Sequence, residues 1–155
     1  MTKDQWASFC SFKEDFKKQC AVWEQRAKNL GLSVLQSKAA LSDGVPAYPV
    51  ENPIVYNTAL DAICERDSIK LIIIADNPGK EEQLHKNRTY LVGLSGKIAD
   101  GFFKKHPELN IDFRKNVIIL NKTPIHTAKT KELKLLASAD PEIQELIDES
   151  QIWMA

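Results

Sequence analysis

Two short runs of apolar, mostly β-branched residues constrain the fold of this chain more than any other feature. Residues 69–75 and 116–120 form these runs, which are typical of strands covered on both faces within a parallel sheet. Residues 96–105, between the two runs, carry apolar residues at helical spacing. We therefore predict a β-loop-α-β unit with a right-handed parallel crossover, and hence an α/β fold.

Amphipathic helices are predicted before and after this unit. Large apolar residues at three- and four-residue spacing predict one long helix over residues 4–30, and Gly31 provides its stop. Residues 42–53 are rich in proline and other turn residues, which indicates an ordered loop. A shorter helix is expected over residues 56–66, and a last helix over residues 141–153.

The length of 155 residues favours a single domain. We expect residues 1–66 to form a helical N-terminal region and residues 67–155 to form the core unit with the last helix. Strands buried on both faces normally belong to parallel sheets of four or more strands. Either residues 32–35 and 54–55 supply edge strands, or a C-terminal part of a larger domain is absent. We expect the second case, a three-layer α/β/α domain that is incomplete at its C-terminal end.

Composition and charge exclude several classes of protein. The 21 basic and 21 acidic residues, with 43% hydrophobic residues, exclude a disordered chain and a strongly basic nucleic-acid coat protein. Residues 80–134 hold 12 basic against 6 acidic residues, which indicates either an anion-binding face or clustered, solvated surface charge. The three cysteines form no C-x-x-C pair and no long apolar segment occurs. We therefore expect no metal, no membrane contact and a cytoplasmic location.

Polar, turn-forming residues follow both predicted strands. Asp76, Asn77, Pro78 and Gly79 follow the first strand, and Asn121 follows the second. Ligands of open α/β sheets bind beyond the carboxyl ends of parallel strands, and an asparagine amide offers a donor and an acceptor in one plane to a flat heterocycle. The alternative interpretation is that both asparagines form turns that merely end the strands.

Three segments together resemble the uracil-DNA glycosylase superfamily. Residues 75–79, Ala-Asp-Asn-Pro-Gly, are similar to the G-x-N-P-G form of its water-activating loop, with alanine in place of the first glycine. Residues 88–96 resemble its aromatic segment R-x-F-V-G-x-x-G, and residues 118–121 resemble the strand that ends in a base-reading asparagine. The three segments occur in the superfamily's order within residues 69–131.

The resemblance implies hydrolysis of the N-glycosidic bond of uracil, or of a related damaged base in DNA, as a step of base-excision DNA repair. It implies that Asn77 positions the hydrolytic water and that Asp76 contributes as an electrostatic or basic group. It implies no metal and no cofactor. Because an amide is not a full general base, a slower or more base-selective reaction is expected than in the branches that carry aspartate at this place.

The resemblance also implies how the base is held. Pro78 and Gly79 would shape the loop against the base edge. Tyr90 would stack on a flipped-out base, and Asn121 would hydrogen-bond its Watson–Crick face.

Three lysines, one histidine and one missing motif complete the prediction. Lys122, Lys129 and Lys131 either contact DNA phosphates or are simply solvated. His126 is a further candidate site residue, or else a surface residue or local hydrogen-bond donor. The superfamily's second catalytic loop, a histidine motif after a later strand, has no counterpart, because His106 precedes the second predicted strand. Enzymatic activity is therefore expected only if that loop exists in the natural protein.

Two alternative functions stay open. The first is a non-catalytic nucleobase- or nucleic-acid-binding module of the same fold. The second is an unrelated α/β nucleotide-binding protein whose loop contacts phosphate, although residues 76–80 lack the spacing of a Walker motif. The sequence makes no prediction of the oligomeric state.

Overall fold

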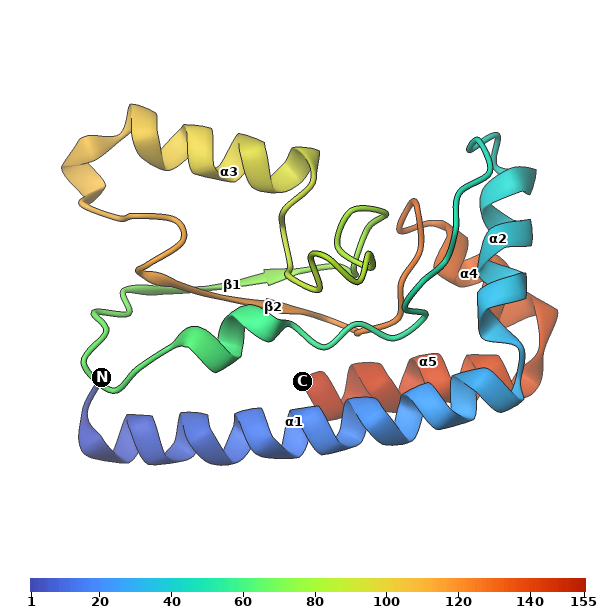
Figure 1. Ribbon diagram of the computed structural model, residues 1–155, viewed down its shortest axis with the longest axis horizontal. Coiled ribbons are helices and arrows are strands. Elements are labelled where there is room, and N and C mark those ends of the chain that lie inside the picture. Colours follow the sequence, from blue (N-terminus) through green and yellow to red (C-terminus); the bar gives the residue numbers. More distant parts are fainter.

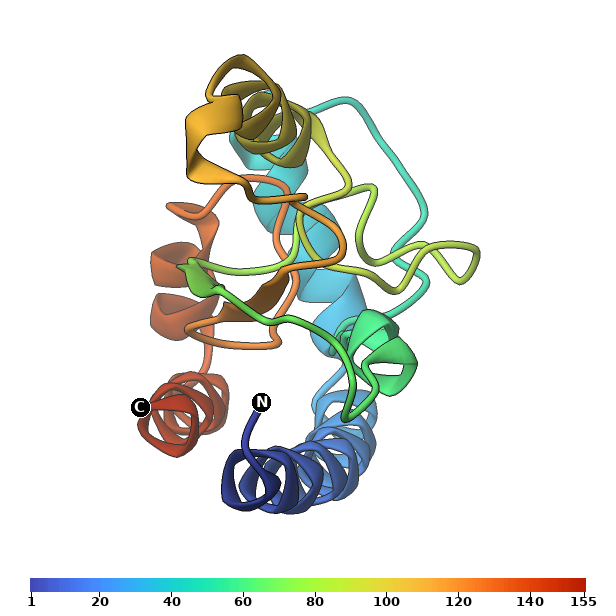
Figure 2. The same ribbon diagram turned by 90° about the vertical axis from the view of Figure 1, so that its left-hand side faces the viewer.

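Helices cover both sides of a short parallel sheet in the computed structural model, which describes residues 1–155 (Figure 1). In chain order the elements are α1 (Lys3–Asn29), α2 (Leu32–Ser42), the 3-10 helix η1 (Thr58–Ala62), β1 (Leu71–Ala75), α3 (Leu94–Lys105), the 3-10 helix η2 (Pro107–Leu109), β2 (Val117–Asn121), α4 (Glu132–Ala139) and α5 (Pro141–Met154). β1 and β2 pair in parallel, with Ala75 opposite Asn121. α3 lies on one side of the sheet, and α1 and α5 lie on the other (Figure 2). The predicted β-loop-α-β unit is confirmed.

The long first helix is confirmed as α1. Thr2 caps its start, because the Thr2 hydroxyl accepts the N–H of Gln5 while the Gln5 side chain accepts the N–H of Thr2. Gly31, with a φ of 62°, separates it from α2. The buried face of α1 joins β2 and α5 in the main core. Its largest members are Phe16, Trp23, Tyr56, Leu60, Ile118, Ile125, Ile143 and Leu146.

A smaller core lies between the sheet and α3. It consists of Val55, Tyr90, Phe113, Val117 and Ile119. Side chains alternate along a strand, so the odd-numbered residues of β2 face this smaller core. Asn121, the last residue of the strand, follows them on the same side.

β1 differs from the prediction that both strands are covered on both faces. Ile72 and Ile74 are 57% and 63% exposed, whereas Ile118 and Ile119 of β2 are buried on opposite faces. The physical reason is that the sheet has only two strands and that the main core covers Ile118 of β2 but not its neighbour Ile72 of β1. The prediction of two-sided burial therefore holds for β2 alone.

Neither candidate edge strand extends the sheet. Residues 32–35 belong to the helix α2, and Ile54 forms only an isolated antiparallel bridge with Ile125. The helix expected over residues 56–66 is reduced to η1, and α4 was not predicted. No helix combines the length and the apolar character that crossing a membrane requires.

Candidate functional site

The polar residues that follow β1 and β2 lie at one end of the sheet, as predicted. Asn121 pairs with Ala75 in the strand register, and Asn77 comes two residues after Ala75. Residues 123–127, which follow β2, are all buried. This buried segment runs along the loop after β1 and binds it through backbone and side-chain groups.

The side-chain amide of Asn77 is held in one orientation. Its Nδ2 donates to the Thr127 hydroxyl at 2.8 Å and lies 3.3 Å from the Ile125 carbonyl oxygen. A carbonyl oxygen can only accept, so the nitrogen and not the oxygen of the amide must face it. The Oδ1 of Asn77 accepts no hydrogen bond from the protein and is free to bind a water or a ligand.

His126 fixes the same loop from inside the protein. The Pro78 carbonyl oxygen accepts the N–H of Thr127 at 3.1 Å and lies 2.9 Å from His126 Nδ1, which therefore carries a proton. His126 Nε2 then accepts the Tyr48 hydroxyl at 2.9 Å. Burial lowers the pKa of His126 to about 4, so the ring is neutral at pH 7. Of the two roles considered for His126, the structure has it as a local hydrogen-bond donor.

Gly79 is anchored by the carboxylate of Glu82, which no sequence pattern singles out. The Gly79 N–H donates to Glu82 Oε2 at 3.1 Å. Glu82 is buried, and this burial raises its pKa, although backbone N–H groups that point at the carboxylate oppose the shift. A Cβ atom added at Gly79 would meet no heavy atom within 4 Å. The loop therefore has a fixed inner side and open space at Gly79.

Asn121 is the most unusual residue at this end of the sheet. It is only 1% exposed, yet neither its Nδ2 nor its Oδ1 has a hydrogen-bond partner. Nearly all buried polar groups in proteins are paired, because an unpaired group loses its bonds to water without replacement. A donor and an acceptor are thus available together, inside the protein, where β2 ends.

Tyr90 lies inside the smaller core and presents no ring face. It is fully buried, and its hydroxyl donates to the Val55 carbonyl oxygen at 2.6 Å. Arg114 donates to the Tyr90 carbonyl oxygen at 3.2 Å. Arg88 and Leu91, on either side, have positive φ angles of 41° and 53°, which are strained for residues other than glycine. The predicted stacking on a base requires the ring or its cover to move.

The predicted charged residues are exposed and already paired. Asp76 Oδ1 binds Lys122 Nζ at 2.6 Å, and both side chains are more than half exposed. Lys129 and Lys131 both bind the carboxylate of Asp43, Lys129 at 2.8 Å. The Asp76–Lys122 pair is exposed on both sides, and such pairs contribute little to stability, so Lys122 can exchange its carboxylate for a phosphate at small cost. The Asp43 side chain is only 14% exposed, so Lys129 and Lys131 neutralise a largely buried carboxylate and are less free to bind a phosphate.

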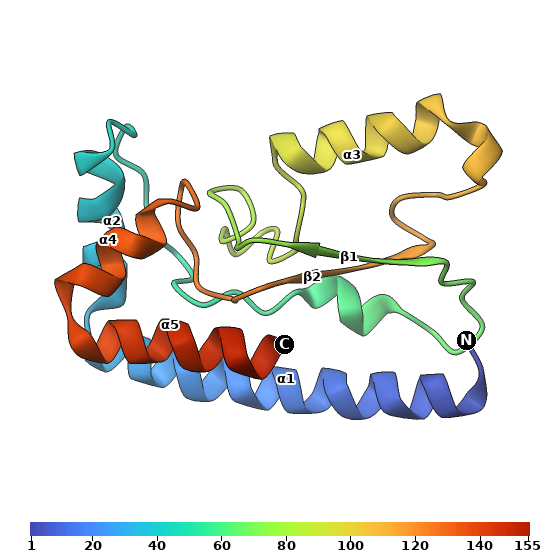
Figure 3. The same ribbon diagram turned by 180° about the vertical axis from the view of Figure 1, so that it is seen from behind.

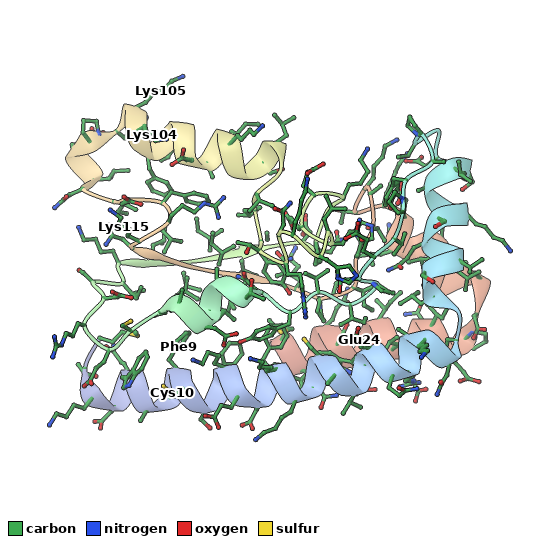
Figure 4. All side chains as sticks on the ribbon, viewed as in Figure 1. Phe9, Cys10, Glu24, Lys104, Lys105 and Lys115 are labelled. Carbon is green, nitrogen blue, oxygen red and sulfur yellow. The ribbon has the colours of Figure 1, made fainter.

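The basic middle segment of the chain does not form one basic face. Lys104, Lys105 and Lys115 project at the amino ends of the strands, away from Asn77 and Asn121 (Figure 4). The basic residues that cluster along the sequence are therefore divided between the two ends of the sheet.

No large opening leads to the buried amide. None of the five principal surface cavities is lined by Asn77 or Asn121. No group of three or more metal-binding side chains occurs. Asn77 and Asn121 therefore lie at the same end of the sheet but line no common cavity among these five.

Several residues of this site escaped the sequence analysis. Thr127 orients Asn77, Glu82 anchors Gly79, and Arg114 holds the Tyr90 loop. The one sequence signal for them is that residues 123–127 contain no charged residue in an otherwise lysine-rich stretch, which is typical of a buried segment.

Comparison of the chain with known protein families, curated proteins and solved structures finds no match. The functional assignment therefore depends on the chemistry of the residues themselves.

Proposed function

We propose that this chain is a uracil-DNA glycosylase-like protein with a three-layer α/β/α fold. It binds uracil, or a related damaged base, through Asn121, and where the natural protein supplies the second catalytic loop it hydrolyses the N-glycosidic bond with a water bound to Asn77. The unpartnered, buried amide of Asn121 carries the proposal. Uracil presents an N–H donor beside a carbonyl acceptor in one plane, which is the complement of an amide. Binding the base satisfies both atoms of Asn121 at once.

Asn77 supports the catalytic part of the proposal. Its nitrogen is held by Thr127, so its free oxygen has a fixed direction in which to accept a hydrogen bond from a water. The water oxygen bonds to C1′ of the sugar while the C1′–N1 bond breaks, and the bonding electrons leave with the base. The water proton passes to solvent. A hydrogen bond from Asn121 Nδ2 stabilises the negative charge that develops on the base.

The proposal requires the site to open. Asn121 and Tyr90 are both closed to solvent, so a base enters only after part of their cover moves. The loop of residues 88–91 is the best candidate for this movement, because its positive φ angles are unfavourable and a changed backbone would relieve them.

A binding module without hydrolysis is the second candidate, and one observation favours it. The nearest sequence-predicted carboxylate, Asp76, is exposed and paired with Lys122, so it is not aimed at a buried water. A phosphate-binding loop of an unrelated nucleotide-binding protein is less consistent with the structure. Its central backbone donor, the Gly79 N–H, is taken by Glu82, and a carboxylate at that point repels phosphate.

The release of free uracil from a single-stranded oligonucleotide tests the proposal. Asn77→Ala should lower turnover roughly 100-fold or more with little change in DNA affinity. Asn121→Ala should remove the preference for uracil over cytosine in binding, and the exposed Asn29→Ala serves as the control. Selective binding of uracil without release would support the binding module. Absence of both release and selective binding would overturn the proposal.

A further inference from the structure

The outer edge of β1 has no partner. The Ala75 carbonyl oxygen accepts the N–H of Lys122, so the odd-numbered residues of β1 hydrogen-bond to β2. The backbone groups of Ile72 and Ile74 consequently point away from β2. Their side chains are mostly exposed, and no helix crosses in front of β1 in Figure 3. Backbone groups and apolar side chains are therefore both open on this edge.

β1 carries none of the devices that protect edge strands. Such strands usually contain a lysine, a proline or a bulge, or are covered by another element, because an open apolar edge pairs with other strands. Residues 71–75 read Leu-Ile-Ile-Ile-Ala and pair with β2 in an unbroken register. This edge has the properties of a strand-pairing surface.

We propose that β1 pairs with β1 of a second copy of this chain, antiparallel around a two-fold axis at Ile73. The two sheets then join into one sheet in the order β2-β1-β1-β2. In this register Ile72 lies opposite Ile74 of the second copy, and the outward backbone groups of each such pair exchange both hydrogen bonds. The isoleucine side chains pack as cross-strand pairs on one face.

Charge complementarity identifies a second copy as the occupant. Lys70 precedes β1 and Asp76 follows it, each the same distance from Ile73. The two-fold register therefore sets Lys70 of each chain opposite Asp76 of the other. Both side chains are exposed, and each would exchange a contact within its own chain for the new pair, Lys70 with the Asn110 carbonyl oxygen and Asp76 with Lys122. The strand is thus complementary to its own reverse in both charge and hydrophobicity, as a symmetric interface requires.

An apolar groove beside the edge supplies additional interface. A cavity of about 660 Å³ between α1 and the sheet is lined mainly by apolar side chains, including Phe9, Phe12, Ile72 and Leu120 (Figure 4). Stable interfaces bury about 800 Å² on each partner, more than a five-residue strand provides. The groove adds apolar surface on the face where the second copy's isoleucines would pack. The inference does not depend on the proposed function.

Analytical ultracentrifugation of the chain tests this dimer. The protein should sediment with twice the mass of one chain at micromolar concentration. Ile74→Lys should weaken association roughly 100-fold, because the two-fold axis places each substitution in the interface twice. Ile98→Lys, at a 65% exposed position on α3, is the control and should leave the dimer intact. A wild-type monomer at all concentrations, or a dimer insensitive to Ile74→Lys, would overturn the proposal.

A charge exchange tests the register. Lys70→Asp and Asp76→Lys each set like charges against one another across the axis, and each should weaken the homodimer several-fold. A mixture of the two variants pairs opposite charges again and should associate as a heterodimer close to wild-type strength. Circular dichroism checks that each variant is folded. Failure of the mixture to restore association would show that the two-fold register at Ile73 is wrong.

Discussion

Two asparagines are buried at β2, one that contacts the strand and one that ends it. The first is hydrogen-bonded through both amide atoms, and the second has no hydrogen-bond partner. Asn57 and Asn121 are each only 1% exposed. Asn57 Nδ2 donates to the Ile119 carbonyl oxygen at 2.9 Å, and its Oδ1 accepts the N–H groups of Ala59 and Tyr90. Asn121, two residues after Ile119, has no partner on either atom.

The difference separates a structural asparagine, Asn57, from Asn121, whose unpaired amide we propose binds a ligand. Asn57 joins three segments that are distant in the sequence, so its burial stabilises the fold. The unpaired amide of Asn121 costs about 1–3 kcal/mol, which is a large part of a typical net stability of about 5–15 kcal/mol. Residues that lower stability in the free protein are expected where binding needs them.

Of the substitutions that test this comparison, replacement of Asn57 should change the stability of the protein most. Asn57→Leu leaves the Ile119 carbonyl and the N–H groups of Ala59 and Tyr90 without partners inside the protein. Loss of several buried hydrogen bonds should lower the free energy of unfolding by roughly 3–5 kcal/mol. Urea denaturation followed by circular dichroism measures this change. A loss below about 1 kcal/mol would mean that the Asn57 contacts are not structural.

Acid should protonate the buried ring of His126 and remove the hydrogen bond that its Nε2 accepts. Burial lowers its pKa from 6.5 to about 4, so below pH 6.5 the unfolded chain takes up a proton before the folded protein does. Stability should be full above about pH 7, fall between about pH 6.5 and 4, and lose about 3 kcal/mol in total. The difference between wild type and His126→Gln, measured by urea denaturation at each pH, isolates this residue from the other titrating groups. Parallel curves for the two proteins would contradict the prediction.

Asn121→Leu should change stability in the direction opposite to Asn57→Leu. It removes an unpaired amide and keeps a side chain of similar size, so the free energy of unfolding should rise by roughly 1–2 kcal/mol. The same variant should lose any thermal stabilisation by uracil. Destabilisation as large as that of Asn57→Leu would show that Asn121 has a structural partner, such as a bound water.

The sequence predicts the elements of this fold better than their exposure. The apolar runs identify β1 and β2, and the spacing of apolar residues identifies α1, α3 and α5, because these patterns are local. The exposure of Ile72 and Ile74 depends on how many strands join the sheet, which no local pattern contains. α2 was taken for a candidate strand at residues 32–35, since a short apolar run fits either element.

The sequence predicts where the candidate site lies, but not whether its side chains are buried or hydrogen-bonded. Parallel strands place Asn77 and Asn121 at one end of the sheet, which the sequence already implies. Whether an amide is paired depends on every atom around it. Tyr90 illustrates this point: it is fully buried between Arg88 and Leu91, whose positive φ angles no local sequence pattern predicts.

Asn77 is intermediate between Asn57 and Asn121 in how much of its amide is hydrogen-bonded. Its replacement should give the smallest change in stability. The nitrogen of its amide is bound to Thr127 and, at a longer distance, to Ile125, whereas the oxygen is open, so Asn77→Ala removes one short and one long hydrogen bond and should cost about 1 kcal/mol. A double-mutant cycle with Thr127→Val should assign about that value to the pair. The same Asn77→Ala variant should lose far more in uracil release than in stability, because the proposed function assigns its free oxygen to the hydrolytic water. Equal free-energy losses in uracil release and in stability would show that Asn77 has only a structural role.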